Sequence, residues 1–259
     1  SLATTAAKSS DELAVRPGTI YTSRGRASFG LPAGKYIVYA GRGFEYPLAK
    51  AEVAVAKDQT ATTKLEIRRE VPTEEYVACD THIPTLTHSG HGDATDRERV
   101  ITLAAEGIEL PIFTDHNVAI DYEPVAHEMG VRQHFTPVIG NEVTTSVGHF
   151  NIFPIALGAR MPDATLTDWD AIFDEIYATP GVRVAILNHA RDLHRGTRPF
   201  GPKLHLGVVG EHVEGWRLRG RGMEVLNSSA TQSDVVQLFH DWMGILNCGL
   251  NITPVGSSD

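Results

Sequence analysis

The sequence is poor in the residues that mark several common protein classes. Its only cysteines, Cys79 and Cys248, provide neither a disulfide framework nor a cysteine-rich zinc site, so we expect both to be buried as small apolar side chains. No apolar run approaches the roughly 20 residues that a transmembrane helix needs. These absences predict a soluble protein without a membrane partner.

Positive charge is also scarce. The 23 Lys and Arg residues are outnumbered by 32 Asp and Glu residues, which gives a net charge of -9 at pH 7. Because nucleic-acid binding depends on clustered Lys and Arg, we expect no nucleic-acid partner. The opening, SLATTAAKSS, lacks both an initiator Met and the apolar segment of a signal peptide. It fits an exported protein whose leader has been removed, or a sequence added in cloning, so the compartment stays open.

What is present is enough apolar sequence, 42%, to fill a core, in two regions of different pattern. After a flexible segment at residues 1–16, short runs such as KYIVYAG, AEVAVAK and TKLEIRRE predict a small antiparallel β-sandwich over residues 17–74. The linker-like REVPTEEY separates it from a second domain over residues 75–259. The alternative is one domain with the β unit as an edge elaboration.

From Tyr76 onward, predicted strands alternate with predicted helices. The first helix begins at a capping box formed by Thr95 and Glu98 and ends at Gly107. Further helices are predicted in DWDAIFDEIYATPG and SDVVQLFHDWMGILNCG. This alternation implies a parallel sheet or barrel.

Ligand-type side chains follow almost every predicted strand of this second region. They are His82, Asp115, His116, Glu142, His189 and Asp259. Each alone is better explained as a turn cap, a satisfied polar pair or a solvated charge, but the carboxyl ends of parallel strands meet at one mouth. Histidine and carboxylate without cysteine suit Zn, Mn or Fe, and a carboxylate can bridge two ions. The joint placement therefore favours a metal site.

Seven segments carry a resemblance to a known family: DTHIPTLTHSGHGD, IFTDHN, IGNEV, GHFNIFP, ILNHARD, MEVLNS and TPVGSSD. In this order they resemble the polymerase and histidinol phosphatase (PHP) superfamily, and most closely its branch of metallohydrolases similar to carbaryl hydrolase. The β unit before them resembles a carboxypeptidase-regulatory-like domain. The resemblance implies a distorted (β/α)7, TIM-like barrel, incomplete at its C-terminal end, with one to three divalent ions.

The resemblance also implies residue roles. The implied metal ligands are His82, His91, Asp93, His116, Glu142, His149, His189 and Asp259. The implied catalytic residues are Asp115, as orienter or proton carrier, and His189. Two departures from the motifs matter: Pro84 stands where the opening His-x-His has its second histidine, and the histidine of a closing Asp-x-His would follow Asp259. Pro84 offers neither an imidazole nor a backbone N–H.

A cationic loop follows His189 in NHARDLHRGTRPFGPK. Its predicted substrate-binding residues are Arg191, Arg195, Arg198 and Lys203. Guanidinium groups match phosphate or carboxylate in a bidentate manner, although a solvated loop is an equal alternative.

The sequence thus predicts a PHP-type metallohydrolase in which a metal-bound hydroxide attacks a small-molecule phosphoester. One alternative is a carbamate or carboxylic ester hydrolase of the same fold. The other is a non-catalytic binding module with a degenerate metal site. The oligomeric state is left open.

Overall fold

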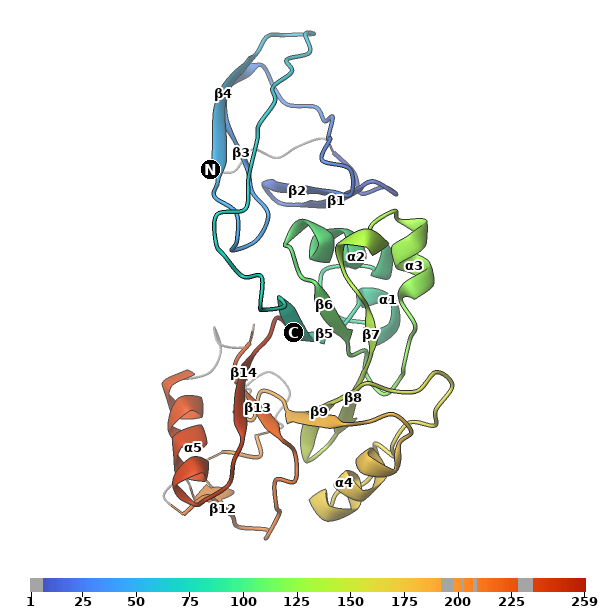
Figure 1. The fold of residues 1–259 in the computed structure, drawn as a ribbon, viewed down its shortest axis with the longest axis vertical. Coiled ribbons are helices and arrows are strands. Elements are labelled where there is room, and N and C mark those ends of the chain that lie inside the picture. The colour runs from blue at the N-terminus through green and yellow to red at the C-terminus, as the bar shows by residue number, and fades with distance from the viewer. Residues whose placement is uncertain (1–6, 192–197, 202, 207–208, 228–234) are drawn as a thin grey trace. The chain divides into compact units, whose positions relative to one another are not determined.

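A computed structural model of the protein describes residues 7–191, 198–201, 203–206, 209–227 and 235–259 (Figure 1). The chain divides into two compact units. Unit 1 contains Ser1–Cys79, Ala94–Leu110 and Glu123–Thr136. Unit 2 contains Asp80–Asp93, Pro111–Tyr122 and Pro137–Asp259. The domain boundary predicted near residue 75 stays a prediction, because unit 1 also takes in two later segments.

Unit 1 is built from two antiparallel hairpins and a helical part. Its elements are β1 (Leu13–Arg16), β2 (Thr19–Thr22), β3 (Gly34–Ala40), β4 (Ala49–Val55), α2 (Asp96–Ala105), α3 (Glu123–Glu128) and the 3-10 helix η1 (Arg132–His134). β1 pairs with β2 and β3 with β4, as two separate two-stranded sheets. Strand β1 lies in the segment predicted to be flexible, whereas TKLEIRRE, predicted as a strand, forms none.

Helix α2 begins where the sequence predicts. Thr95 accepts a hydrogen bond from the backbone N of Glu98 (3.3 Å), and the Glu98 carboxylate accepts one from the backbone N of Thr95 (3.0 Å). The predicted capping box is therefore confirmed. Val100, Leu103 and Ala104 are buried as their helical spacing implies.

Unit 2 holds two main sheets and the remaining helices. The first sheet has the order β5 (Cys79–Ile83), β6 (Leu110–Phe113), β7 (Val138–Ile139). The second has the order β14 (Thr253–Gly256), β13 (Gly222–Leu226), β10 (Val184–Leu187), β9 (Gly148–Phe153), β8 (Asn141–Thr145). Strands β10, β13 and β14 are parallel, but β8, β9 and β10 alternate in direction.

The fold is thus mixed α/β, and the described strands do not close into the predicted barrel. The two sheets approach each other at an isolated parallel bridge between His116 and Glu142. This bridge brings the end of β6 beside β8.

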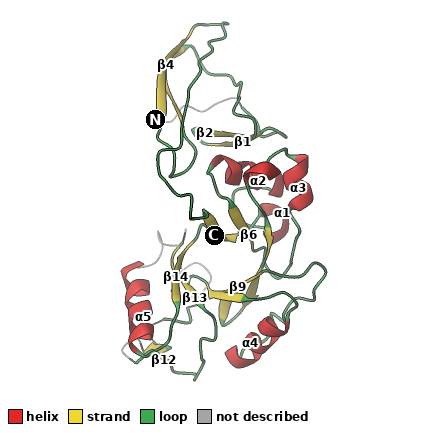
Figure 2. Ribbon diagram, in the orientation of Figure 1, coloured by secondary structure: helices red, strands yellow, loops and turns green. Residues whose placement is uncertain are grey.

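The helices of unit 2 are α1 (Leu86–Ser89), α4 (Trp169–Ala178) and α5 (Val235–Asn247), and the small hairpin of β11 (His205–Leu206) and β12 (Glu211–His212) lies between α4 and α5 in the chain. Of these helices, α4 and α5 lie beside the second sheet, whereas α1 lies beside β6 of the first sheet (Figure 2). Helix α4 is capped by Asp168, which accepts from Ala171 N at 2.9 Å. Its Trp169 and Phe173 rings contact Phe150 of β9, with centroids 5.3 and 5.1 Å apart. The core therefore lies on one face of this sheet, which leaves the other face for polar side chains.

Both cysteines are exposed, so the expectation that they are buried was wrong. Cys79 is the first residue of β5 and Cys248 directly follows α5, so each lies at an end of its element. Among the helices of the described segments, none combines the length and the apolarity that a membrane crossing requires.

Candidate metal centre

Six of the eight predicted ligands lie together in unit 2: Glu142, the four histidines around it, and Asp259 beside one of these histidines. They come from the ends or polar faces of different strands: His82 (β5), His116 (after β6), Glu142 (β8), His149 (β9), His189 (after β10) and Asp259 (after β14). Residues separated by up to 177 positions in the chain, from His82 to Asp259, thus share one site.

The β8–β9 hairpin explains two of these positions. Side chains alternate along a strand, so Val143, Phe150 and Ile152 face the core. The antiparallel register pairs Glu142 with Asn151 and Thr144 with His149. Glu142 and His149 are consequently diagonal neighbours on the opposite, polar face.

Glu142 lies at the centre of the site and is almost fully buried. Its Oε1 atom is 2.9 Å from His149 Nδ1 and 3.2 Å from His189 Nε2. Its Oε2 atom is 3.4 Å from His82 Nε2 and 3.3 Å from His116 Nδ1. Both carboxylate oxygens therefore face imidazole nitrogens from separate strands.

Two groups of side chains have the geometry to hold a cation. One is His82, His189 and Asp259, the other is Glu142, His149 and His189, and within each group the donor atoms lie within 4.8 Å of one another. His189 belongs to both. Imidazole and carboxylate without thiolate suit a divalent ion such as Zn, Mn or Fe.

Two buried atoms test whether a cation fits. His82 Nε2 and Glu142 Oε2 form no hydrogen bond with any described residue. Each atom has ionisable neighbours at 3.3–3.4 Å but no hydrogen bond in place of the one with water that it loses, a loss that typically costs about 1–3 kcal/mol. Because the two atoms lie 3.4 Å apart and each belongs to one of the two groups, a divalent cation bound beside them would satisfy both.

The charges around the site also favour a cation. Burial alone would lower the pKa of His82, but the negative charges of Glu224 and Glu142 outweigh burial and raise that pKa well above its usual range. Burial would raise the pKa of Glu142, but the positive charge on His82 and a hydrogen bond with His149 hold it well below its usual range. Without a metal, a proton on His82 supplies part of the positive charge that a bound ion would supply.

His116 differs from His82 in its surroundings. Burial lowers the pKa of His116 to about 4, and the charge of Glu142 only partly opposes this. The His116 and His91 rings lie edge to face with centroids 4.5 Å apart, and their Nε2 atoms face each other. His91 therefore extends the site beyond Glu142, whereas Asp93 is exposed and lies in neither donor group.

Asp115, predicted to be catalytic, is engaged by the fold. Its Oδ1 atom accepts from Thr85 N and Oγ1, both at 2.8 Å, and from Ser89 Oγ at 2.7 Å. Its Oδ2 atom accepts from Tyr122 OH at 2.5 Å. These contacts hold the loop after β5 in place, and the catalytic role of Asp115 stays a prediction.

Pro84 is buried directly after β5. The residue that stands in place of a predicted histidine therefore offers no side-chain donor to the site. His88, in the same loop, is exposed, and its ring lies against the Tyr122 ring with centroids 6.1 Å apart.

Two residues that the sequence analysis did not select support the ligands. Glu224, in the middle of β13, accepts a hydrogen bond from His82 Nδ1 at 2.6 Å. Asn188 donates to Glu142 Oε1 at 3.2 Å and to Asn151 Oδ1 at 2.8 Å. A signal for Glu224 was present, since a single carboxylate inside the apolar run GMEVL needs buried partners.

Comparisons with known proteins show a similarity among solved structures. No family model matches the chain, and no curated protein matches it. Among solved structures, it is similar to a two-domain protein containing a predicted PHP-like metal-dependent phosphoesterase from Bacteroides vulgatus ATCC 8482. The identity is 21% and the TM-score 0.44, over 71% of this chain and 51% of that chain. The chain thus spans about half the length of that protein.

The predicted substrate-binding loop is described only in part. Arg191 forms a two-point ion pair with the buried Asp241, with Nε–Oδ2 at 2.5 Å and Nη2–Oδ1 at 3.0 Å. Arg198 and Lys203 are exposed, and Arg195 lies outside the described residues. Arg191 therefore anchors its own loop, and substrate binding by this set stays a prediction.

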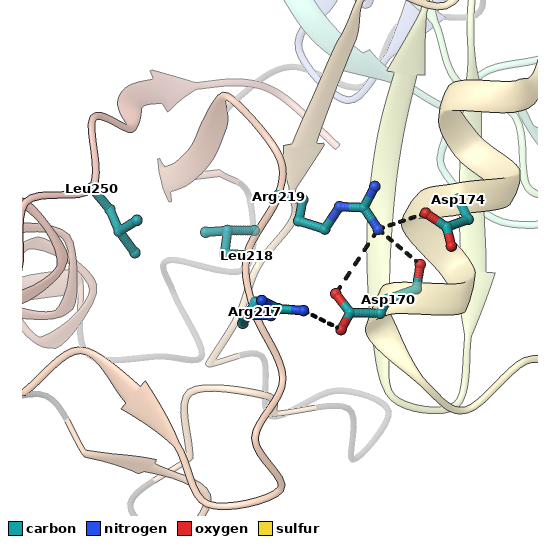
Figure 3. Close-up of a pocket in the computed structure, with 6 residues that line it drawn as sticks. All are labelled: Asp170, Asp174, Arg217, Leu218, Arg219 and Leu250. Atoms are coloured by element: carbon teal, nitrogen blue, oxygen red, sulfur yellow. Dashed lines mark hydrogen bonds and ion pairs between the residues drawn. The ribbon is translucent and has the colours of Figure 1, made fainter.

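A surface pocket elsewhere in unit 2 is also rich in arginine (Figure 3). Arg217 is paired with Asp170 at 2.8 Å, and Arg219 with Asp174 at 2.6 Å. Both aspartates belong to α4. Because each guanidinium already has a carboxylate partner, this pocket is a poor candidate for an anionic ligand.

Proposed function

We propose that the protein is a metal-dependent hydrolase of ester bonds, of the PHP type. The observation that carries this proposal is the convergence of imidazoles from four strand ends on Glu142, with His82 Nε2 and Glu142 Oε2 buried and without hydrogen-bond partners among the described residues. Divalent ions held there would lower the pKa of a bound water and polarise an ester.

The side chains have distinct parts in this proposal. His82, His189 and Asp259 would hold one ion, and Glu142 and His149 would hold another; His189 lies within reach of both positions and would ligate one of the two ions. Asn188 donates to Glu142 and fixes the direction of its carboxylate. We propose that His189 also moves a proton in states in which its ring is not bound to an ion, since it lies within reach of both groups.

For the substrate, we propose a small-molecule phosphoester, as the PHP resemblance implies. Arg198 and Lys203 are the exposed cations of the described loop that support an anionic substrate. Cleavage of a carbamate or carboxylic ester follows if the carbaryl-hydrolase-like branch is the nearer relative. We also propose the (β/α)7 barrel of that family as the fold to which the two sheets of unit 2 are related.

The test combines metal analysis with a substrate panel. Protein purified without chelator should contain at least one divalent ion per chain by elemental analysis. It should hydrolyse bis(p-nitrophenyl) phosphate or p-nitrophenyl phosphate when supplied with Zn, Mn or ferrous ions. Glu142→Gln keeps the shape of the side chain but removes its charge, so metal content should fall and the rate should drop by at least about 100-fold.

Glu211→Gln, at an exposed position of β12, is the matched control and should leave both quantities unchanged. Hydrolysis of p-nitrophenyl acetate or an aryl carbamate, without hydrolysis of either phosphate ester, would indicate that the substrate is a carboxylic ester or a carbamate. Metal binding without hydrolysis of any substrate would favour a binding module. Absence of both metal and hydrolysis in the parent protein would contradict the proposal.

A further inference from the structure

Glu224 is a fully hydrogen-bonded carboxylate beside the candidate site. It lies in β13 and is 1% exposed. Its Oε1 atom accepts from His82 Nδ1 and Ser257 Oγ, each at 2.6 Å. Its Oε2 atom accepts from the backbone N of His189 and from Asn227 Nδ2, each at 2.8 Å. Each oxygen thus has two donors.

This saturation separates Glu224 from the residues that would hold a cation. A carboxylate offers about four lone-pair positions, and protein donors fill all four here. Glu224 accordingly belongs to neither donor group, although it touches a member of each. Its chemistry is that of an acceptor for ligand residues.

The first ligand that Glu224 holds is His82. Because Nδ1 of this ring faces Glu224, one ring proton lies on that side, and Nε2, which lies 3.4 Å from both Glu142 and Asp259, is the nitrogen that would bind an ion once its own proton is displaced. A carboxylate on the far nitrogen of a ligating histidine fixes the orientation of the ring and makes it a stronger donor.

The second ligand is His189, which Glu224 holds through the backbone. His189 has φ 27°, a left-handed conformation that residues with a side chain rarely adopt. The hydrogen bond from its N–H to Glu224 Oε2 stabilises this turn at the end of β10. The turn places the imidazole Nε2 at 3.2 Å from Glu142.

We propose that Glu224 is a positioning residue that sets His82 Nε2 and His189 Nε2, from two separate strands, in register for a shared divalent ion. The proposal rests on the proposed function, because it requires that these two histidines bind metal. It assigns to one buried side chain the alignment of both donor groups.

The test measures the binding of Zn²⁺ alone, by calorimetry on chelator-treated protein. Glu224→Gln keeps the volume, but its NH₂ group must face donors at one of the two oxygen positions. We expect its affinity for Zn²⁺ to fall by about 10- to 100-fold, while the number of ions bound at saturation stays that of the parent. Glu142→Gln, which removes a ligand, should instead reduce the number of ions.

A second readout reports the geometry directly. In the Zn²⁺-loaded parent, ¹⁵N–¹H spectra of labelled histidine should show His82 with a proton on Nδ1 and the metal on Nε2. In Glu224→Gln this signal should broaden or divide between two ring orientations. A role confined to stability would leave it unchanged.

The control is Phe173→Leu, which changes a residue of α4 in the hydrophobic core that is not a hydrogen-bond partner of Glu224. It should lower the melting temperature without altering the affinity for Zn²⁺. If Glu224→Gln does not fold, Glu224→Asp keeps the charge and withdraws the carboxylate by one methylene, and it should also weaken binding. Parental affinity in whichever variant folds, or a loss of ions equal to that in Glu142→Gln, would overturn the proposal.

Different outcomes would contradict the proposed function and the role of Glu224. If the parent protein binds neither Zn²⁺ nor Mn²⁺, the proposed function fails and this inference fails with it. If the parent binds Zn²⁺ and Glu224→Gln binds it equally well, only the role of Glu224 is lost.

Discussion

Two histidines that touch the same carboxylate respond to it in opposite ways. Both His82 and His116 lie within 3.4 Å of Glu142 Oε2, yet the pKa of His82 is raised and that of His116 is lowered to about 4. For His82, the charges of Glu224 and Glu142 outweigh burial, whereas for His116 burial outweighs its single carboxylate. His116 is thus neutral and able to ligate at neutral pH, and a metal must displace the proton of His82.

This contrast predicts a pH dependence of stability in the metal-free protein. His116 has a folded-state pKa of about 4, below its ordinary value of 6.5. Between these values the unfolded chain binds a proton that the folded chain does not, so His116 makes the protein less stable as pH falls through this window. One full proton corresponds to a slope of up to about 1.4 kcal/mol per pH unit.

The measurement is urea unfolding in the presence of chelator at several pH values from 6.5 down to 4.5. His116→Gln should flatten the slope toward that of a protein with one fewer titrating group. His240→Gln, at an exposed position of α5, is the control and should keep the parental slope. Equal slopes in the parent and His116→Gln would contradict the assignment.

At the scale of the elements, Asp115 links β6 to α1 in unit 2. It joins the end of β6 to Thr85, which caps α1, and to Ser89 at the end of that helix. Tyr122 completes the link, since its hydroxyl donates to Asp115 and its ring stacks on Phe113 with centroids 3.8 Å apart. Asp115 therefore determines where the loop after β5 lies, and His116 follows it directly in the chain.

Tyr122→Phe should consequently destabilise the protein by about 2 kcal/mol, because it removes a buried hydrogen bond to a charged group. Urea unfolding with chelator present measures the change. Tyr177→Phe is the matched control, since that hydroxyl donates to the carbonyl of Arg219 at an exposed position, and it should cost less than about 1 kcal/mol. In a double-mutant cycle, Tyr122→Phe should lower the free energy of unfolding by less in the Asp115→Asn background than in the parent protein. Equal effects of the two Tyr→Phe changes would show that Asp115 is not the anchor of this loop.

The strand ends were predictable because the signal for them is local. A run of apolar residues followed by a polar ligand-type residue marks both a strand and the position where it ends, as in VAILNH, which closes at His189. The Glu224 contacts were not predictable in the same way, because they depend on which strands are neighbours. The order β14-β13-β10-β9-β8 places β13 beside β10, and no local sequence pattern predicts that these two strands are neighbours. The alternation of strands and helices likewise could not reveal the antiparallel β8–β9 hairpin.

For the molecule as a whole, the division into units was the least predictable feature. Composition changes near residue 75, but contacts assign Ala94–Leu110 and Glu123–Thr136 to the same unit as the N-terminal hairpins. Arg16 and Glu98 show why, since their ion pair at 3.3 Å joins β1 to α2 while both side chains are largely buried. Composition describes neighbours in sequence, whereas a unit is defined by contacts between distant segments.

A pair of glycines tests this assignment within unit 1. Gly43 and Gly25 both have positive φ, 60° and 66°. At Gly43 an added Cβ would lie 2.0 Å from the backbone oxygen of Glu106, just after α2, whereas at Gly25 nothing lies within 4 Å. Alanine at either position carries the strain of a left-handed backbone, about 1 kcal/mol, but only Gly43→Ala also forces two chain segments apart.

We therefore expect Gly43→Ala to lower the free energy of unfolding by about 1–3 kcal/mol more than Gly25→Ala does, as measured by urea unfolding. Because the two variants share the backbone strain, their difference isolates the close approach of residue 43 to residue 106. The Zn²⁺ affinity of both should stay parental, since neither residue belongs to unit 2. If the two variants are equally stable, the segment around residue 43 does not pack against the end of α2, and a domain that is independent up to residue 74 becomes the better description of this part of the chain.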